Sequence, residues 1–200
     1  MIFLEYLNQI NTLKIGKKIR LSVYIIFTYL FFINFVNGQD MNNENENRLH
    51  LELKDGIVVI QLLPDLAPNH VNRIKELARM NFYDNTPIHR VIDGFMAQMG
   101  DPTGSGSGGS DLPDLKSEFS NEPHVRGIVS MARTPDPNSA NSQFFIMFDS
   151  APSLDNQYTV WGKVIEGMDF VDNIKKGDGM NGIVEDPDFI ISLKVASDIN

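Results

Sequence analysis

Short apolar runs separated by turn residues fill most of this chain from residue 49 onward, and they constrain its fold more than any other feature. Runs of about four to eight residues bounded by Gly, Pro, Asp and Asn are typical of strands. We predict strands at 49–53, 57–62, 88–92, 95–100, 127–132, 142–148, 158–167 and 188–196. Strand–helix alternation is too sparse for a doubly wound parallel sheet, so the pattern favours an antiparallel sandwich or barrel. Closure into a barrel would also remove exposed strand edges.

Two segments have the apolar spacing of a helix. Residues 64–82 predict one helix, with Pro68 tolerated in its first turn. Residues 168–176 predict a second, short amphipathic helix. Between the first two strands, Asp55-Gly56 predicts a type I′ hairpin turn, because both central residues of that turn need a positive φ. The apolar face of the first helix consists of Val71, Ile74, Leu77 and Ala78.

The first 38 residues predict export. A basic stretch at 14–20 precedes the uncharged apolar run 21–36, and Gly38 is a small residue at the boundary. The run is about 16 residues long, shorter than the roughly 20 that a spanning helix needs. We therefore expect 1–38 to be a cleaved signal peptide and the protein to be exported, in a bacterial periplasm. The alternative is an uncleaved segment that anchors the chain in the inner membrane.

Residues 39–48 are polar and rich in Asn and Glu, with no apolar periodicity. Such a segment is typical of a flexible linker. We expect the folded domain to occupy residues 49–200.

Composition and spacing disfavour several classes of function. The net charge of −9 disfavours nucleic acid as a partner, because phosphate contacts need clustered Lys and Arg. Cysteine is absent, so disulfides and thiol nucleophiles are excluded. The four histidines lack ligand spacing and no G-x-S-x-G motif occurs, so we expect neither a metal or other cofactor nor a serine nucleophile of that type. The glycine-rich run 103–110 lacks the Lys of a phosphate-binding loop, and we interpret it as a flexible surface loop.

One cation and two amides stand among apolar strand residues. In the predicted strand 88–92, Arg90 shares a face with two isoleucines, where a cation is costly unless it is paired. A salt-bridged or snorkelling arginine would be the structural interpretation. Core packing would explain the neighbouring aromatic and thioether side chains, but it explains Gln98 and Gln143 less well, because buried amides need partners. Together these residues predict an apolar pocket with a few polar anchors, which suits a proline ring with a carbonyl beside it.

Three segments resemble the cyclophilin family, in particular its bacterial branch. They are HRVIDGFMAQMGD at 89–101, SMARTPDPNSANSQFFI at 130–146 and YTVWGKVIEGMD at 158–169, and the resemblance extends over about 49–197. It implies a mainly β fold, an eight-stranded closed antiparallel β-barrel capped by two α-helices. It also implies an outer groove that binds X-Pro peptides, and peptidyl-prolyl cis-trans isomerase activity.

The resemblance also implies residue roles. Arg90 matches the catalytic arginine, and Gln98 and Gln143 match amides that bind the substrate backbone and orient that arginine. Substrate would lie along Ala132, Arg133 and Thr134. The proline pocket would be lined by Phe95, Met96, Phe145, Leu154 and Tyr158, the last of which stands where a histidine is common. Ser153 replaces a tryptophan that often contacts cyclosporin, so we expect weak cyclosporin binding.

The expected partners are proline-containing polypeptides, and the protein is expected to be a monomer that touches a membrane only if its N-terminal segment is uncleaved. We expect it to accelerate X-Pro isomerisation in exported proteins and so to assist their folding. Two alternatives are a proline-peptide-binding chaperone with low turnover and a membrane-tethered structural subunit.

Overall fold

The computed structural model describes residues 44–199. A hairpin of strands β1 and β2 lies near the start of this part. β1 (Arg48–Leu53) pairs antiparallel with β2 (Gly56–Leu62), and the last pair in register is Leu53 with Gly56. The hairpin is as predicted, but its two turn residues are Lys54 and Asp55, and neither has the positive φ that a type I′ turn needs. A Cβ on Gly56 would lie 2.5 Å from a ring carbon of Phe170, so close packing requires the glycine.

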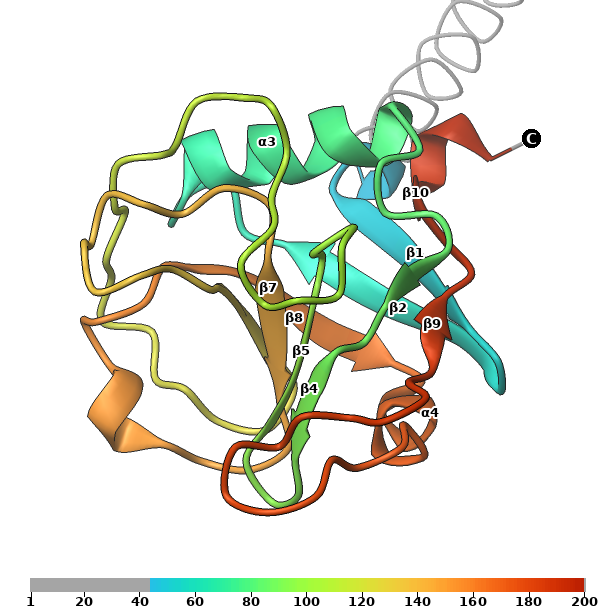
Figure 1. Cartoon of the computed structure of the whole chain (residues 1–200). Helices are drawn as coiled ribbons and strands as arrows, with labels where there is room; N and C mark the ends of the chain where they lie inside the picture. The colour runs from blue at the N-terminus through green and yellow to red at the C-terminus, as the bar shows by residue number, and fades with distance from the viewer. Residues whose placement is uncertain (1–43, 200) are drawn as a thin grey trace, which may run out of the picture. The chain divides into compact units, whose positions relative to one another are not determined.

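Eight antiparallel strands form one curled sheet in the order β10-β1-β2-β8-β6-β7-β5-β4 (Figure 1). The mainly β class and the eight-stranded antiparallel sheet are thereby confirmed. The remaining strands of this sheet are β4 (Arg90–Ile92), β5 (Met96–Met99), β6 (Ile128–Met131), β7 (Phe144–Met147), β8 (Val160–Glu166) and β10 (Ser192–Val195).

The sheet does not close by direct pairing of its two end strands, β4 and β10. A separate pair, β3 (Thr86–Pro87) and β9 (Phe189–Ile190), joins the segments that precede them. The predicted closed barrel is therefore corrected to a curled sheet whose seam is held by β3–β9. The break between β9 and β10 falls at Ile191, whose N–H donates to the carbonyl of Glu52 on β1, so that β9 pairs with β3 and β10 pairs with β1.

The first predicted helix is α3 (Pro68–Arg79), which contacts β10 and β8. Pro68 lies in its first turn as expected, but Ala67 at the N-cap provides no side-chain bond. Instead, the Glu118 carboxylate accepts the main-chain N–H groups of Asn69, at 3.1 Å, and His70, at 3.0 Å. A residue far along the chain therefore satisfies donors that a helix start leaves unpaired.

The second predicted helix is α4 (Met168–Asp172), which contacts β2 and is shorter than the predicted 168–176. The described part also contains two 3-10 turns, η1 (Pro152–Leu154) and η2 (Ala196–Asp198).

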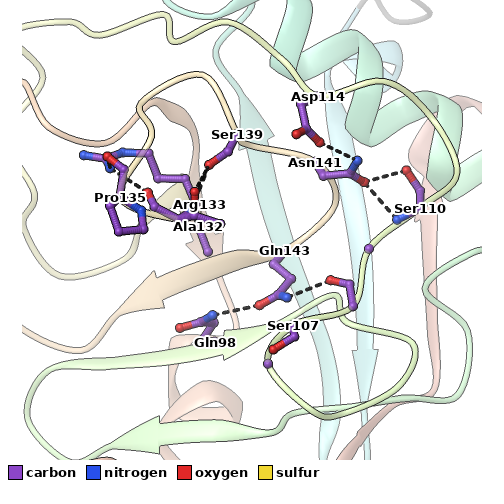
Figure 2. Close-up of a pocket in the computed structure, with 14 residues that line it drawn as sticks. Gln98, Ser107, Ser110, Asp114, Ala132, Arg133, Pro135, Ser139, Asn141 and Gln143 are labelled. Atoms are coloured by element: carbon purple, nitrogen blue, oxygen red, sulfur yellow. Dashed lines mark hydrogen bonds between the residues drawn. The ribbon is translucent and has the colours of Figure 1, made fainter.

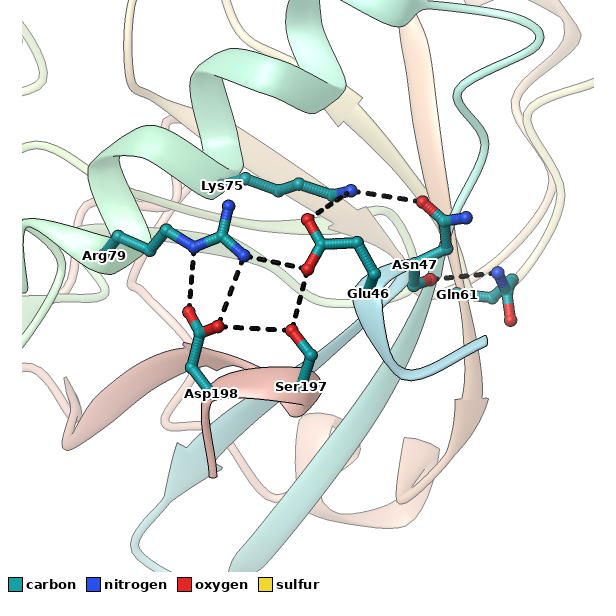
Figure 3. A network of polar contacts seen from close by, with 7 residues as sticks. All are labelled: Glu46, Asn47, Gln61, Lys75, Arg79, Ser197 and Asp198. Carbon is teal, nitrogen blue, oxygen red and sulfur yellow. Dashed lines mark hydrogen bonds and ion pairs between the residues drawn. The ribbon is translucent and has the colours of Figure 1, made fainter. Parts of the chain in front are cut away.

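The domain begins earlier than predicted. Glu46, inside the predicted linker 39–48, bonds to Lys75 at 3.2 Å, Arg79 at 2.8 Å and Ser197 at 2.7 Å (Figure 3). Residues 44–48 are therefore held against α3 and η2, and the linker prediction is wrong for them. The polar composition and the lack of apolar periodicity suggested a linker. The partners of an acidic side chain cannot be read from the sequence, because they are brought beside it only by folding.

The predicted signal or anchor at 1–38 lies outside the described residues. Among residues 44–199, no helix has both the length and the apolar character to cross a membrane.

Alternation along β7 separates two apolar clusters in the described part of the chain. Phe144 and Ile146 belong to the main core inside the curled sheet, where Phe144 packs edge-on against Tyr83 and Trp161. Phe145 and Met147 point to the opposite face and join a smaller cluster. The smaller cluster contains Met96, Ile128, Phe145, Met147 and Val160, with Phe95, Ala132, Leu154 and Tyr158 packed against it. The residues proposed from sequence for the proline pocket therefore gather on the outer face of the sheet.

Candidate active site

Strand register brings the predicted cation and amides into one row. Arg90 on β4 pairs with Gln98 on β5, and Gln98 in turn pairs with Phe145 on β7. Nη1 of Arg90 donates to Oε1 of Gln98 at 3.1 Å, and Nε2 of Gln98 donates to Oε1 of Gln143 at 2.8 Å. Nε2 of Gln143 then donates to the carbonyl of Gly108 at 2.8 Å, as Figure 2 shows for the two amides. The amides are thus partnered, and each one orients the next.

Arg90 is held by neutral acceptors only. Besides Gln98, its Nε donates to the main-chain carbonyl of Asn181 at 2.9 Å. Within residues 44–199 it forms no ion pair, so the salt-bridge interpretation does not apply. In the same part of the chain no protein atom accepts a hydrogen bond from Nη2. A half-buried cation with a free donor edge can therefore serve a ligand.

An apolar hollow of about 210 Å³ opens beside this guanidinium. Phe145 forms its floor, packed edge-on against Tyr158 with ring centroids 5.5 Å apart and stacked on His124 at 6.3 Å. Two aromatic neighbours fix the Phe145 ring in a single orientation. The hollow is lined by Arg90, Phe95, Met96, Gln98, Ala132, Arg133, Phe145, Leu154 and Tyr158.

A second, larger hollow of about 510 Å³ lies on the other side of the segment 132–134. Thr134 and Gln143 line only this larger hollow, whereas Ala132 and Arg133 border both. The guanidinium of Arg133 lies 4.7 Å from the centroid of the Tyr158 ring and donates to the carbonyl of Gln157. The structure thus brings all the predicted site residues together, but divides them between two adjoining hollows.

The glycine-rich run is ordered around an internal carboxylate, which the flexible-loop interpretation missed. Asp101 is fully buried and accepts main-chain N–H groups from Thr103 at 2.8 Å, Gly106 at 2.7 Å and Gly108 at 3.0 Å. Burial by itself raises the pKa of Asp101, but these bonds and the Thr103 hydroxyl outweigh it and lower the pKa to about 2. The carboxylate occupies the concavity of N–H groups where a phosphate would bind. An Asp two residues before a glycine-rich run is the sequence signal that was available.

A second buried network lies behind the apolar hollow and was not predicted. Nδ1 of His124 lies 3.0 Å from Oδ1 of Asp155, and its Nε2 lies 3.0 Å from Oγ of Ser130. The order of groups is that of a serine hydrolase, but Ser130 is fully buried and cannot reach a substrate. The network of Ser130, His124 and Asp155 is structural, because it fixes the His124 ring that stacks on Phe145.

The apolar hollow faces outward beside a guanidinium that no carboxylate neutralises, and a groove continues from it along 132–134. This shape suits an extended peptide that inserts a small ring. The described residues place no group of three His, Cys, Asp or Glu side chains where they could hold a metal. The hollow and the groove beside it are the features of a peptide-binding protein.

Comparison with known proteins gives the family. The family model described as cyclophilin type peptidyl-prolyl cis-trans isomerase matches residues 48–195. The chain belongs to this family, and it is a peptidyl-prolyl cis-trans isomerase. A probable peptidyl-prolyl cis-trans isomerase of Brucella suis is 54% identical over 165 residues, covering 76% of this chain and 84% of that protein. The human peptidyl-prolyl cis-trans isomerase-like 3 is 39% identical over 132 residues, covering 64% and 80% respectively.

Solved structures agree with this assignment. A cyclophilin of Hirschia baltica superposes with a TM-score of 0.70 at 32% identity, covering 78% of this chain and 76% of that one. A cyclophilin-type isomerase of Cryptosporidium parvum, crystallised in the presence of the dipeptide Ala-Pro, gives 0.68 at 29% identity, covering 74% and 98%.

Proposed function

We propose that this isomerase accelerates X-Pro isomerisation in exported proteins, assisting their folding, and that Arg90 is its catalytic residue. The observation that carries the catalytic role is the guanidinium at the edge of the apolar hollow, held by two neutral acceptors and free at Nη2. The basic and then apolar N-terminal sequence supports export.

The reaction rotates an imide bond and breaks no covalent bond. Its barrier of about 18–20 kcal/mol arises from the partial double bond between carbonyl carbon and prolyl nitrogen. As the bond twists, the nitrogen becomes pyramidal and gains a lone pair that can accept a hydrogen bond. Arg90 donates to that nitrogen and to a neighbouring substrate carbonyl, so it stabilises the twisted state more than the planar one. A rate gain near 10⁵ would require about 7 kcal/mol of such selective stabilisation.

The surroundings of Arg90 strengthen this donation. Phe145, Met96 and Leu154 enclose the proline ring and exclude water, which would otherwise stabilise the planar, charge-separated amide. Because no carboxylate neutralises Arg90 within the described chain, its charge remains available to the substrate. The substrate backbone lies along Ala132, Arg133 and Thr134, of which the first two border both hollows.

The test is a protease-coupled isomerisation assay on the full chain with the substitutions Arg90→Ala and Arg126→Ala. Arg126 is a matched control, because it is an exposed arginine that is paired with Asp172 and lines neither hollow. We expect turnover to fall at least about 100-fold in Arg90→Ala and to stay unchanged in Arg126→Ala. The reason is that Arg90 borders the hollow and Arg126 does not. Normal turnover by Arg90→Ala would overturn the catalytic assignment.

A further inference from the structure

The segment 177–184 holds the main chain on both sides of Arg90. Val91 donates its N–H to the carbonyl of Gly182 at 2.7 Å and accepts the N–H of Gly177 at 3.0 Å. Val184 donates its N–H to the carbonyl of His89 at 3.1 Å. The same segment provides the Asn181 carbonyl, which accepts from Nε of Arg90.

We infer that the main-chain carbonyl of Asn181 is a positioning group for catalysis, which fixes the plane of the Arg90 guanidinium against the proline pocket. This inference rests on the catalytic role proposed for Arg90. A guanidinium is planar and rigid, so one acceptor leaves it free to pivot, whereas acceptors on two nitrogens fix its plane. Oε1 of Gln98 on Nη1 and the Asn181 carbonyl on Nε are those two acceptors.

A carbonyl is suited to this task because it is neutral. A carboxylate in the same place would also orient Arg90, but it would neutralise the charge that the twisted substrate requires. The carbonyl therefore supplies orientation without reducing the electrostatic effect.

Little side-chain packing holds the tip of this turn. Met180 is 96% exposed and Ile183 is 61% exposed, so the position of the Asn181 carbonyl depends on main-chain geometry. Gly179 and Gly182 flank the tip with φ values of 68° and 67°, the left-handed region that favours glycine. The catalytic arginine is thus oriented from a solvent-facing turn.

The two glycines form a matched pair for a test. A Cβ on Gly182 would lie 2.4 Å from Cγ1 of Ile92 and 2.8 Å from the carbonyl oxygen of Val91, so the turn must move away. A Cβ on Gly179 would meet nothing within 4 Å, although its φ is the same within a degree. Gly179→Ala therefore introduces the same backbone strain without displacing the carbonyl of Asn181.

The experiment compares Gly182→Ala and Gly179→Ala in the full chain by turnover, by affinity for an X-Pro peptide, and by the NMR resonance of the Arg90 Nε–H group. For Gly182→Ala we expect turnover to fall at least about tenfold, peptide Kd to change by less than about threefold, and the resonance to shift. For Gly179→Ala we expect all three to stay near those of the unmodified protein.

Equal loss of turnover in both glycine variants would overturn the inference, and so would normal turnover in Gly182→Ala with a shifted resonance. If Gly182→Ala does not fold, deletion of the exposed Met180 moves the same carbonyl without adding atoms near Ile92. Normal turnover in that deletion, with the resonance shifted, would equally overturn it. Normal turnover in Arg90→Ala would instead show that the proposed function itself is wrong.

Discussion

The two protein oxygens that accept hydrogen bonds from Arg90, from Gln98 and Asn181, are both neutral, so in the proposed mechanism its charge is available to the substrate. The sequence indicated Arg90 through its place on an apolar strand face, and it indicated the two glutamines through the cost of burying amides. It could not indicate Asn181, since the contact is made by a carbonyl, which every residue possesses. Side-chain chemistry can be read from sequence, whereas main-chain acceptors become visible only in the fold.

Arg90→Lys tests whether the shape of the cation matters as well as its charge. We expect turnover nearly as low as that of Arg90→Ala, because an ammonium lacks the planar fork that reaches Gln98, Asn181 and the substrate together. Melting temperature should change little, since no buried carboxylate loses a partner. Isomerisation rate and thermal unfolding measured on one preparation check this, and a Lys variant with full activity would contradict it.

Ser153 is the residue that we expect to weaken inhibition by cyclosporin. This exposed residue stands in the η1 turn directly before Leu154 of the apolar hollow. We expect weak inhibition of the unmodified protein and tighter binding by Ser153→Trp, because an indole adds apolar area and a donor worth about 1–3 kcal/mol together. Titration calorimetry on both proteins measures the difference, and equal affinities would show that the positional match is wrong.

At the scale of elements, the strands and helices were predictable from apolar periodicity, and the connections were not. The predicted strand 88–92 is shortened to β4, and the predicted strand 188–196 is divided at Ile191, whose N–H donates to the carbonyl of Glu52 on β1. The predicted flexible loop 103–110 is ordered, because Asp101 satisfies several of its N–H groups at once. Periodicity reports which face is buried, but it contains no information on which distant group satisfies a loop's main chain.

Asp101→Asn tests how much this buried carboxylate stabilises the loop. The folded-state pKa of about 2 is below the usual value for Asp, so the stabilisation is complete above about pH 4 and is lost as pH falls toward 2. We expect Asp101→Asn to lower the free energy of unfolding by roughly 2 kcal/mol at pH 7, because its amide N–H groups would face main-chain donors. The difference from the unmodified protein should shrink between about pH 4 and pH 2.

Denaturant unfolding across that pH range is the measurement. Asp111→Asn is the matched control, since Asp111 is an exposed carboxylate on the same loop. A pH-independent difference for Asp101→Asn would show that charge is not the cause.

At the scale of the whole molecule, the fold class and the outer position of the site followed from sequence and resemblance, while the start of the domain did not. Glu46 and Asn47 belong to the folded unit through contacts with α3 and the C-terminal end. A polar segment is interpreted as a linker unless its partners are known, and those partners are more than 25 residues away along the chain.

Export is a property of the whole chain, and we predict it from residues 1–38. Expression in a bacterial host, followed by cell fractionation and N-terminal sequencing, should give a periplasmic protein that begins after Gly38. A membrane-bound chain that still begins with Met1 would support the anchor alternative. Full-length protein in the cytosol would contradict export altogether.

The apolar hollow lies on the outer face of a sheet whose interior is already filled by Phe144, Trp161 and their neighbours. A client therefore does not have to thread into the enzyme, and only the few residues around one proline must be extended. Catalysis should depend on whether that proline is exposed and not on the length of the client chain. A proline in a surface loop of an almost native protein should then be as good a target as one in a newly translocated chain, which would let the enzyme act late in folding as well as early.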